Sequence, residues 1–146
     1  MEGKQMIEFS IPGNPQALKR HRTFRKGNFT GQYDPSKGDK ADFLAMAMAN
    51  KPDKPLDEPL KVSISCFFAR PKSHYRTGKY SGELKDGVSL YHTKTPDTDN
   101  LAKFVCDALN GIFWTDDKIV AELVVKKRYS EIPSTKIWIE KFQRAV

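Results

Sequence analysis

The stretch LKVSISCFFA at positions 60–69 constrains the fold more than any other part of the chain. Its apolar residues first alternate and then run continuously, a pattern typical of a strand in the interior of a sheet. A sheet with an interior strand has to bury a face against other elements. The chain must therefore also supply the elements that cover this sheet.

Two segments have the apolar period of a helix, and we expect both to pack on the sheet. In residues 40–51 we expect the methionines to fill the core, and the positions at helical spacing are Phe43, Leu44, Ala47 and Met48. In residues 100–110 the apolar stripe consists of Leu101, Phe104, Val105, Ala108 and Leu109, followed by Ile112. Asp99 is expected to cap the start of this second helix, and Asn110-Gly111 to end it.

Three further strands are predicted. Residues 6–11 alternate and are followed by Pro-Gly, and the stretches KIVAELVVKKRYSE and TKIWIEKF near the C-terminus are expected to form a hairpin through SEIPST. The resulting order β, α, β, α, β, β predicts an α/β (α+β) fold. We expect one domain over residues 1–146, with a mixed sheet of about four strands and two main helices packed on it.

Two long segments between these elements are rich in basic and aromatic residues. Residues 14–35 are predicted to form a loop in which basic residues alternate with aromatic residues. This composition fits an arm that contacts phosphates, and it also fits a loop that is only solvated. Residues 70–96 have little periodicity, and a loop of that length in a compact domain is usually functional or disordered. Both segments are candidates for contact with a polyanion.

The charge of the chain favours such a partner. The formal net charge is +7 and the pI is about 9.4. Excess Lys and Arg favours polyanions through counterion release, so nucleic acid leads and an anionic membrane surface comes second. Mild basicity without a specific partner is the alternative. No apolar run approaches the roughly 20 residues that cross a bilayer, and the N-terminus lacks the pattern of a signal peptide, so an intracellular, membrane-free protein is expected.

The cysteines and histidines suggest no site of their own. Cys66 and Cys106 lie inside apolar runs without a CxxC spacing, so we expect small buried or half-buried hydrophobic residues. His21, His74 and His92 are far apart in polar surroundings and are expected at the surface. A serine nucleophile elbow, a P-loop and a Cys-His arrangement are also missing from the sequence, which argues against acyl-transfer and P-loop phosphoryl-transfer enzymes.

An acidic cluster stands out against this basic background. Residues 95–117 contain a single basic residue, Lys103, and the carboxylates Asp97, Asp99, Asp107, Asp116 and Asp117. Asp97 and Asp99 are two apart in an extended segment, so their side chains point the same way and can share a metal. Lys103 follows Asp99 by four residues on the solvent side of the helix. The turn through GIFW would bring Asp116 or Asp117 back beside the start of the helix.

Such a cluster suits metal-dependent phosphodiester hydrolysis. Mg²⁺ prefers oxygen ligands and is often held by one or two carboxylates, waters and substrate phosphates. Two ions activate the attacking water and stabilise the leaving oxygen, and a lysine at the rim adds positive charge where negative charge develops. A structural explanation remains open, in which Asp99 caps the helix, Asp107 pairs with Lys103 and the last two acids form a turn.

A resemblance to a known family favours the catalytic interpretation. The stretch YHTKTPDTDNLAKFVCDALNGIFWTDDKIVAELVVKKRY, residues 91–129, resembles the signature of the RusA family of Holliday junction resolvases, which reads DxDNLxKxxxDALNG followed by WxDD and a basic strand. The segments RPKSHYRTGKY and PGNPQALKRHR also look like parts of that family. Thr98 is a departure, because the family often has an apolar residue between the two acids.

The resemblance implies a small dimeric endonuclease that cuts four-way DNA junctions with Mg²⁺ or Mn²⁺, encoded by a bacterium or prophage and acting in the cytoplasm. It implies Asp97, Asp99 and Asp117 as catalytic metal ligands, with Asp116 as the less certain member of its pair, and Lys103 as the essential basic residue. Asn100 would orient the helix start and Asp107 would be structural. A homodimer also suits the substrate, because a two-fold junction needs two cuts and a C₂ dimer supplies two sites.

The basic residues are the predicted DNA-binding surface. They are Lys19, Arg20, Arg22, Arg25, Lys26, Arg70, Lys72, Arg76, Lys79, Lys94, Lys126 and Lys127. Two other functions remain open: a junction-binding protein that does not cleave DNA, and a metal-dependent nuclease with another preference, such as flaps, replication forks or RNA. The first predicts salt-dependent binding without metal-dependent products, and substrate competition separates the second.

Overall fold

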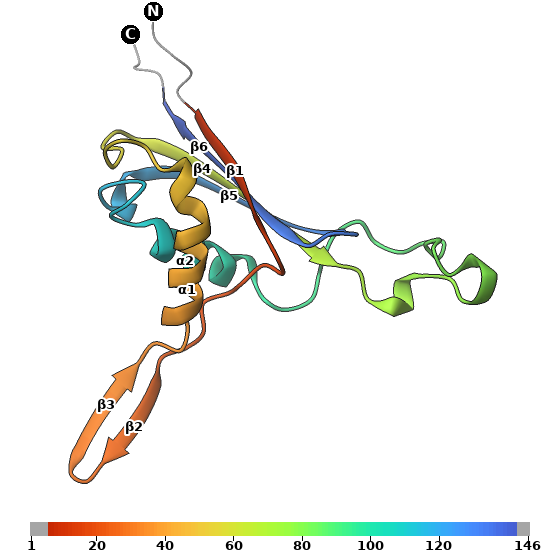
Figure 1. Ribbon diagram of the computed structural model, residues 1–146, viewed down its shortest axis with the longest axis horizontal. Coiled ribbons are helices and arrows are strands. Elements are labelled where there is room, and N and C mark those ends of the chain that lie inside the picture. Colours follow the sequence, from red (N-terminus) through yellow and green to blue (C-terminus); the bar gives the residue numbers. More distant parts are fainter. Residues whose placement is uncertain (1–5, 143–146) are drawn as a thin grey trace, which may run out of the picture.

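A four-stranded mixed sheet forms the centre of the molecule. The structure is a computed structural model and describes residues 6–142. The strands lie in the order β1 (Met6–Pro12), β6 (Ser134–Lys141), β4 (Leu60–Ala69) and β5 (Val120–Ser130). β6 is antiparallel to both of its neighbours, whereas β4 and β5 are parallel (Figure 1). The predicted interior strand is β4, with the predicted bounds.

Two helices cover one face of this sheet. They are α1 (Lys37–Ala47), which continues as a 3₁₀ turn over Met48–Asn50, and α2 (Thr98–Leu109). The ring of Phe43 from α1 meets the ring of Phe104 from α2 edge-on, with centroids 5.6 Å apart. The core contains the predicted stripe of α2 together with one side of each strand of the sheet, including Phe9, Val62, Ile64, Ile137 and Ile139. The predicted α+β fold and its mixed sheet are confirmed.

The C-terminal strands do not form the predicted hairpin. The connection over residues 131–133 carries the chain past the end of β4, and β6 inserts between β1 and β4. β6 lies in the interior of the sheet and buries Thr135, Ile137 and Ile139 on one side, whereas β5 lies at an edge and buries only Tyr129.

The basic segment 14–35 was predicted to be a loop, and this prediction was wrong. It contains a two-stranded hairpin, β2 (Arg22–Lys26) and β3 (Phe29–Tyr33), which projects away from the sheet and helices (Figure 1). The turn between the strands contains Gly27 at φ +62°, a backbone conformation that glycine adopts without strain. We refer to residues 22–33 as the hairpin arm.

The prediction for the methionines of α1 was wrong. Met46 and Met48 are 47% and 40% exposed, because the buried side of the helix consists of Phe43 and Ala47. Cys66 is buried, Cys106 is half-buried and both are free thiols, as predicted. Over the described residues, no helix combines the length and apolar character needed to cross a membrane.

Residues 70–96 form a second projection on the other side of the body (Figure 1). This segment, which we call the loop arm, contains 3₁₀ turns at Lys72–His74 and Gly78–Tyr80. The Arg76 guanidinium lies 2.7 Å from Glu83 and 4.0 Å from the centroid of the Tyr80 ring. A bridge between Tyr75 and Leu84 closes the distal part of the loop arm. The segment is therefore structured by its own contacts.

Candidate active site

The first two acids of the predicted site lie at the N-terminal end of α2. Asp97, and not Asp99 as predicted, is the N-cap residue, and its side chain makes no capping hydrogen bond. Asp99 lies in the first turn of α2, so the prediction that both acids lie in one extended segment was wrong; both residues are exposed. Within residues 6–142, neither carboxylate accepts a hydrogen bond or forms an ion pair. The positive end of the helix dipole favours negative charge here, and both groups are available to a ligand.

Lys103 continues the same exposed side of α2. It lies one turn after Asp99 and is exposed, and among the described residues it has no ion-pair partner. Asp107 does not pair with Lys103. It lies 3.7 Å from the Lys40 ammonium of α1, which also lies 2.6 Å from Asp34. Lys40 thus links the two helices and leaves Lys103 without a competing partner.

A tight turn after α2 positions the last two acids. Gly111 has φ +80° and donates its backbone N–H to the carbonyl of Trp114 at 2.7 Å. The Trp114 side chain is fully buried, and its indole N–H donates to Asp117 Oδ1 at 2.7 Å. Asp116 instead accepts the backbone N–H of Lys118 at 2.9 Å. Asp116 therefore caps a turn, whereas Asp117 is half-buried and oriented by a buried ring.

Asp117 lies in an acidic environment beside the later part of α2. Burial is the main cause that raises its pKa, the Trp114 hydrogen bond lowers it, and the charges of Asp107 and Asp116 raise it. Burial also raises the pKa of the Cys106 thiol to about 12, with further contributions from Asp117 and Asp107. Cys106 follows Asp99 by seven residues, about 10 Å along a helix axis. The turn thus brings Asp117 within electrostatic range of Cys106 and Asp107.

The acids form two groups along one side of α2. Asp97 and Asp99 are at its start, Asp117 adjoins its second half, and Lys103 lies between them. In the described part of the chain, no three His, Cys, Asp or Glu side chains lie close enough together to bind one ion. The oxygen donors suit a hard divalent cation such as Mg²⁺, which commonly takes one or two carboxylates and completes its shell with water and phosphate.

The root of the hairpin arm contacts the start of α2. The backbone N–H of Leu18 donates to the carbonyl of Asn100 at 3.1 Å, and that of Lys19 donates to Ser36 Oγ at 2.8 Å. The Lys19 side chain lies 3.7 Å from Asp39. Every residue from Lys19 to Thr30 is exposed. Asn100, which the resemblance assigns to orienting the helix start, therefore also anchors this arm.

The loop arm joins the other side of the same region. It leads into the helix start through Lys94, Pro96 and Asp97, and its root pairs with β5. The backbone N–H of His92 donates to the carbonyl of Lys127 at 3.2 Å, and the Lys127 ammonium donates to the carbonyl of Lys94. Three predicted DNA-binding lysines, Lys94, Lys126 and Lys127, thus lie close to this root. The start of α2 lies between the roots of both arms.

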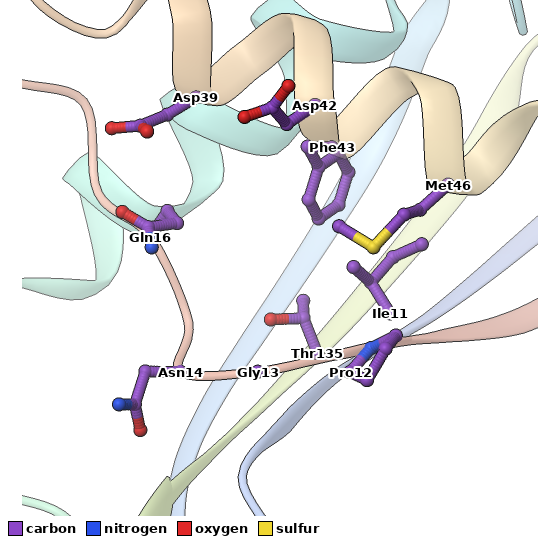
Figure 2. Close-up of a pocket in the computed structure, with 10 residues that line it drawn as sticks. All are labelled: Ile11, Pro12, Gly13, Asn14, Gln16, Asp39, Asp42, Phe43, Met46 and Thr135. Carbon is purple, nitrogen blue, oxygen red and sulfur yellow. The ribbon is translucent and has the colours of Figure 1, made fainter.

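A pocket of about 210 Å³ lies at the base of the hairpin arm, where the chain leaves β1 (Figure 2). Its apolar side consists of Ile11, Phe43 and Met46, and its rim carries the carboxylates of Asp39 and Asp42. None of the predicted catalytic residues lines this pocket. The candidate active site is therefore separate from it.

The sequence is similar to known proteins. A family model described as Endodeoxyribonuclease RusA matches residues 12–140. The chain belongs to the RusA family. One similar protein is the uncharacterized protein YqaN of Bacillus subtilis, with 31% identity over 135 residues, which cover 91% of this chain and 94% of that protein.

The RusA match spans the two arms, α2 and the turn with Asp117. Sequence reasoning missed two residues that support the site. Trp114 positions Asp117. A tryptophan three residues before an acid could have indicated this contact, because a buried Trp N–H usually finds a hydrogen-bond partner. Lys40 was also missed, because no local pattern predicts which acid on another helix it pairs with.

The two histidines of the loop arm were predicted to be ordinary surface residues, but the structure places them partly inside the protein. His74 and His92 are half-buried, and the His92 ring stacks on Phe68 with centroids 3.9 Å apart. Burial lowers the pKa of His92 below 6.5, and the nearby charges of Lys127 and Lys94 lower it further. His92 therefore favours its neutral form in the folded protein.

This shift predicts a loss of stability at mildly acidic pH. Because the folded pKa is depressed, the unfolded chain takes up a proton first as the pH falls below about 6.5. The contribution of His92 is complete above that pH and is lost as the pH falls through the folded pKa. In His92→Phe, we expect the drop in Tm between pH 7 and pH 5 to be about 1–3 °C smaller than in the wild type. The exposed His21→Gln is the control, and equal drops in all three proteins would contradict the prediction.

Proposed function

We propose that this RusA-family protein is a metal-dependent endonuclease that resolves four-way DNA junctions as a homodimer. The observation that carries the proposal is the position of Asp97 and Asp99. They begin α2 between the roots of two basic projections and have no protein partner among the described residues. Acids placed on a DNA-binding surface oppose binding, so their presence favours a role in the reaction.

The proposed metal ligands are Asp97, Asp99 and Asp117, with Mg²⁺ as the expected ion and Mn²⁺ as a substitute. A bound divalent ion activates water and stabilises charge on the phosphate. Asp97 and Asp99 offer carboxylates at the N-cap and in the first turn of α2, and Asp117 offers the oxygen atom that Trp114 does not occupy. Because Asp117 adjoins a different part of α2, we propose that water and substrate phosphate complete the coordination.

Lys103 is proposed to act on the phosphate. Its ammonium has no competing carboxylate in the described structure, because Lys40 takes Asp107. It lies on the same side of α2 as Asp99, so a phosphate bound at the acids is within the range of its charge. A fixed cation there stabilises the additional negative charge of the transition state.

The two arms are proposed to bind DNA on either side of the site. The hairpin arm and the residues before it carry five cations, and the sequence from Lys19 to Tyr33 contains no acid. The loop arm and β5 carry the others. Phosphate contacts of this kind supply affinity without sequence selectivity, and they make that affinity salt-dependent. Two copies of the site in a C₂ dimer would cut the opposed strands of a junction.

This role implies where the protein acts. Junction resolution takes place where DNA recombines, so we propose that it acts in the cytoplasm of a bacterial cell, as a bacterial or prophage-encoded enzyme in DNA recombination and repair.

The deciding experiment is cleavage of labelled synthetic DNA. The purified protein is incubated with a four-way junction, a flap, a fork and a linear duplex, each in Mg²⁺, Mn²⁺ and EDTA. Paired nicks on opposed strands of the junction, only with metal, are expected. If the flap or the fork is cut in preference to the junction, the protein is a nuclease specific for that structure and not a resolvase. Tight junction binding without products in either metal would leave a binding protein.

The contribution of the hairpin arm has its own prediction. Replacing Arg22 and Lys26 by Ala should weaken binding to all DNA forms and reduce the slope of log K against log salt by about 2, because each phosphate contact contributes about one unit. Fluorescence anisotropy at several salt concentrations measures this slope. The matched control is Lys51→Ala with Lys54→Ala, two exposed cations before β4. Identical slopes for the two double variants would show that the arm does not touch DNA.

A further inference from the structure

We propose that one face of the hairpin arm is a base-stacking surface for unpaired bases at the branch point of the DNA substrate. This inference rests on the proposed function and adds to it the feature that distinguishes branched DNA from duplex. It concerns aromatic side chains that neither the acids nor the phosphate contacts use.

The strand register divides the hairpin arm into two unlike faces. Residues paired across an antiparallel ladder share a face, and side chains alternate along each strand. The pairs Arg22–Tyr33, Phe24–Gly31 and Lys26–Phe29 therefore form one face. The opposite face contains Thr23, Arg25, Thr30 and Gln32. All three rings of the hairpin arm and two of its cations thus lie on the same side.

The three rings are exposed and form a group. Phe24, Phe29 and Tyr33 are 42%, 63% and 48% exposed. The ring centroid of Phe24 lies 6.0 Å from that of Phe29 and 6.3 Å from that of Tyr33. Isolated hairpins are marginally stable in water, and clustered exposed apolar groups mark an interaction site more often than scattered ones do.

Gly31 gives the surface its shape. A Cβ atom at this position would lie 2.7 Å from the ring of Phe24, so any other residue would displace that ring. Its φ is not in the left-handed region, so a side chain here would disturb the Phe24 ring rather than the backbone conformation. The missing side chain lets Phe24 lie across the strand beside Phe29. The result is a low aromatic surface bordered by Arg22 and Lys26.

Charge decides between nucleic acid and protein as the occupant. Rings combined with cations are the composition of surfaces that bind single-stranded nucleic acid, where each base stacks on an aromatic ring without sequence readout. No acid lies between Lys19 and Tyr33, so the surface matches a polyanion. The hydrogen bonds of Leu18 to Asn100 and of Lys19 to Ser36 fix the root of the arm to both helices. A base bound on the arm would therefore have a fixed position relative to Asp97 and Asp99.

The test measures binding in Ca²⁺ or EDTA, so that it does not depend on cleavage. Phe29→Ala should weaken junction binding by about tenfold, since stacking on one ring contributes on that order, and should change duplex binding by less than about twofold. Phe29→Trp, which keeps a stacking ring, should retain junction affinity. Thr30→Ala, on the opposite face, is the matched control. Phe29 and Thr30 are both exposed, so the Tm of all three variants should stay at the wild-type value.

Cross-linking provides a second readout. A junction with 5-iodouracil at the branch point should cross-link to a peptide that contains Phe24, Phe29 or Tyr33, whereas the same base placed about ten base pairs away should not. Equal affinities of the wild type and Phe29→Ala for the junction, together with no such cross-link, would overturn the stacking surface while leaving the proposed function standing. A changed oligomeric state of Phe29→Ala in sedimentation, with unchanged DNA affinity, would assign the face to a second copy and also overturn it. A wild type that neither binds nor cuts DNA would overturn both.

Discussion

Replacement of Asp99 by Asn is expected to reduce junction cleavage by about a thousandfold or more, while junction binding stays the same or becomes tighter. The substitution keeps the size of the side chain and removes a proposed metal ligand, and losing a preorganised group at a transition state has effects of this order. Binding should not suffer, because the lost charge faces phosphate. The measurement is single-turnover cleavage in Mg²⁺ beside anisotropy of the same junction in Ca²⁺.

The structure makes Asp99 a clean position for this test. Within residues 6–142 its carboxylate has no protein partner, so the substitution breaks no contact of the fold. The favourable interaction with the helix dipole is worth about 0.3–1 kcal/mol, so the loss of stability should be small. Asp53→Asn, which removes the same charge from an exposed position before β4, is the control and should cut normally. Cleavage by Asp99→Asn within tenfold of the wild type would refute the assignment of the site.

Truncation of Phe104 is expected to have the largest effect on stability. This ring is 1% exposed and packs edge-on against Phe43, so it joins the two helices. Removing a fully buried phenyl group costs about 3–5 kcal/mol, through lost burial and the cavity that remains. Because small domains are stable by only about 5–15 kcal/mol, Phe104→Ala should unfold in much less urea or at a much lower Tm.

Equilibrium urea unfolding followed by circular dichroism tests this expectation. Phe142→Ala is the matched control, because it makes the same truncation at a side chain that is 39% exposed. Its free energy of unfolding should stay within about 1 kcal/mol of the wild type. Equal stabilities of the two variants would show that the packing between α1 and α2 does not support the fold as described.

The burial of Asp117 makes the stability of the fold depend on pH. Burial raises the pKa of Asp117, so the folded state binds a proton here more tightly than the unfolded chain does. That contribution is complete below the ordinary pKa of 3.8 and is lost as the pH rises through the folded pKa. At neutral pH the ionised group therefore opposes folding in the absence of a cation. A carboxylate kept there at such a cost fits the proposed role as a metal ligand.

Local physics accounts for what the sequence determined by itself. Alternating and continuous apolar patterns located β1, β4 and α2, because burial of one face imposes a period on the residues that form it. The apolar stripe of α2 was correct, and its end at Asn110-Gly111 agrees with the structure. The free thiols were also predictable, because apolar neighbours and missing CxxC spacings are features of the chain itself.

The tertiary structure decided the features that depend on residues far apart in the chain. The position of β6 between β1 and β4 depends on pairing with strands far away in the chain, and a short connection such as residues 131–133 suggested a hairpin instead. The faces of the hairpin arm follow from its register, which a basic and aromatic composition does not reveal. The place of Asp117 depends on how Trp114 packs, and the approach of the hairpin arm to α2 depends on the hydrogen bond from Leu18 to Asn100. A local sequence pattern carries the period of an element, whereas only packing determines which elements become neighbours.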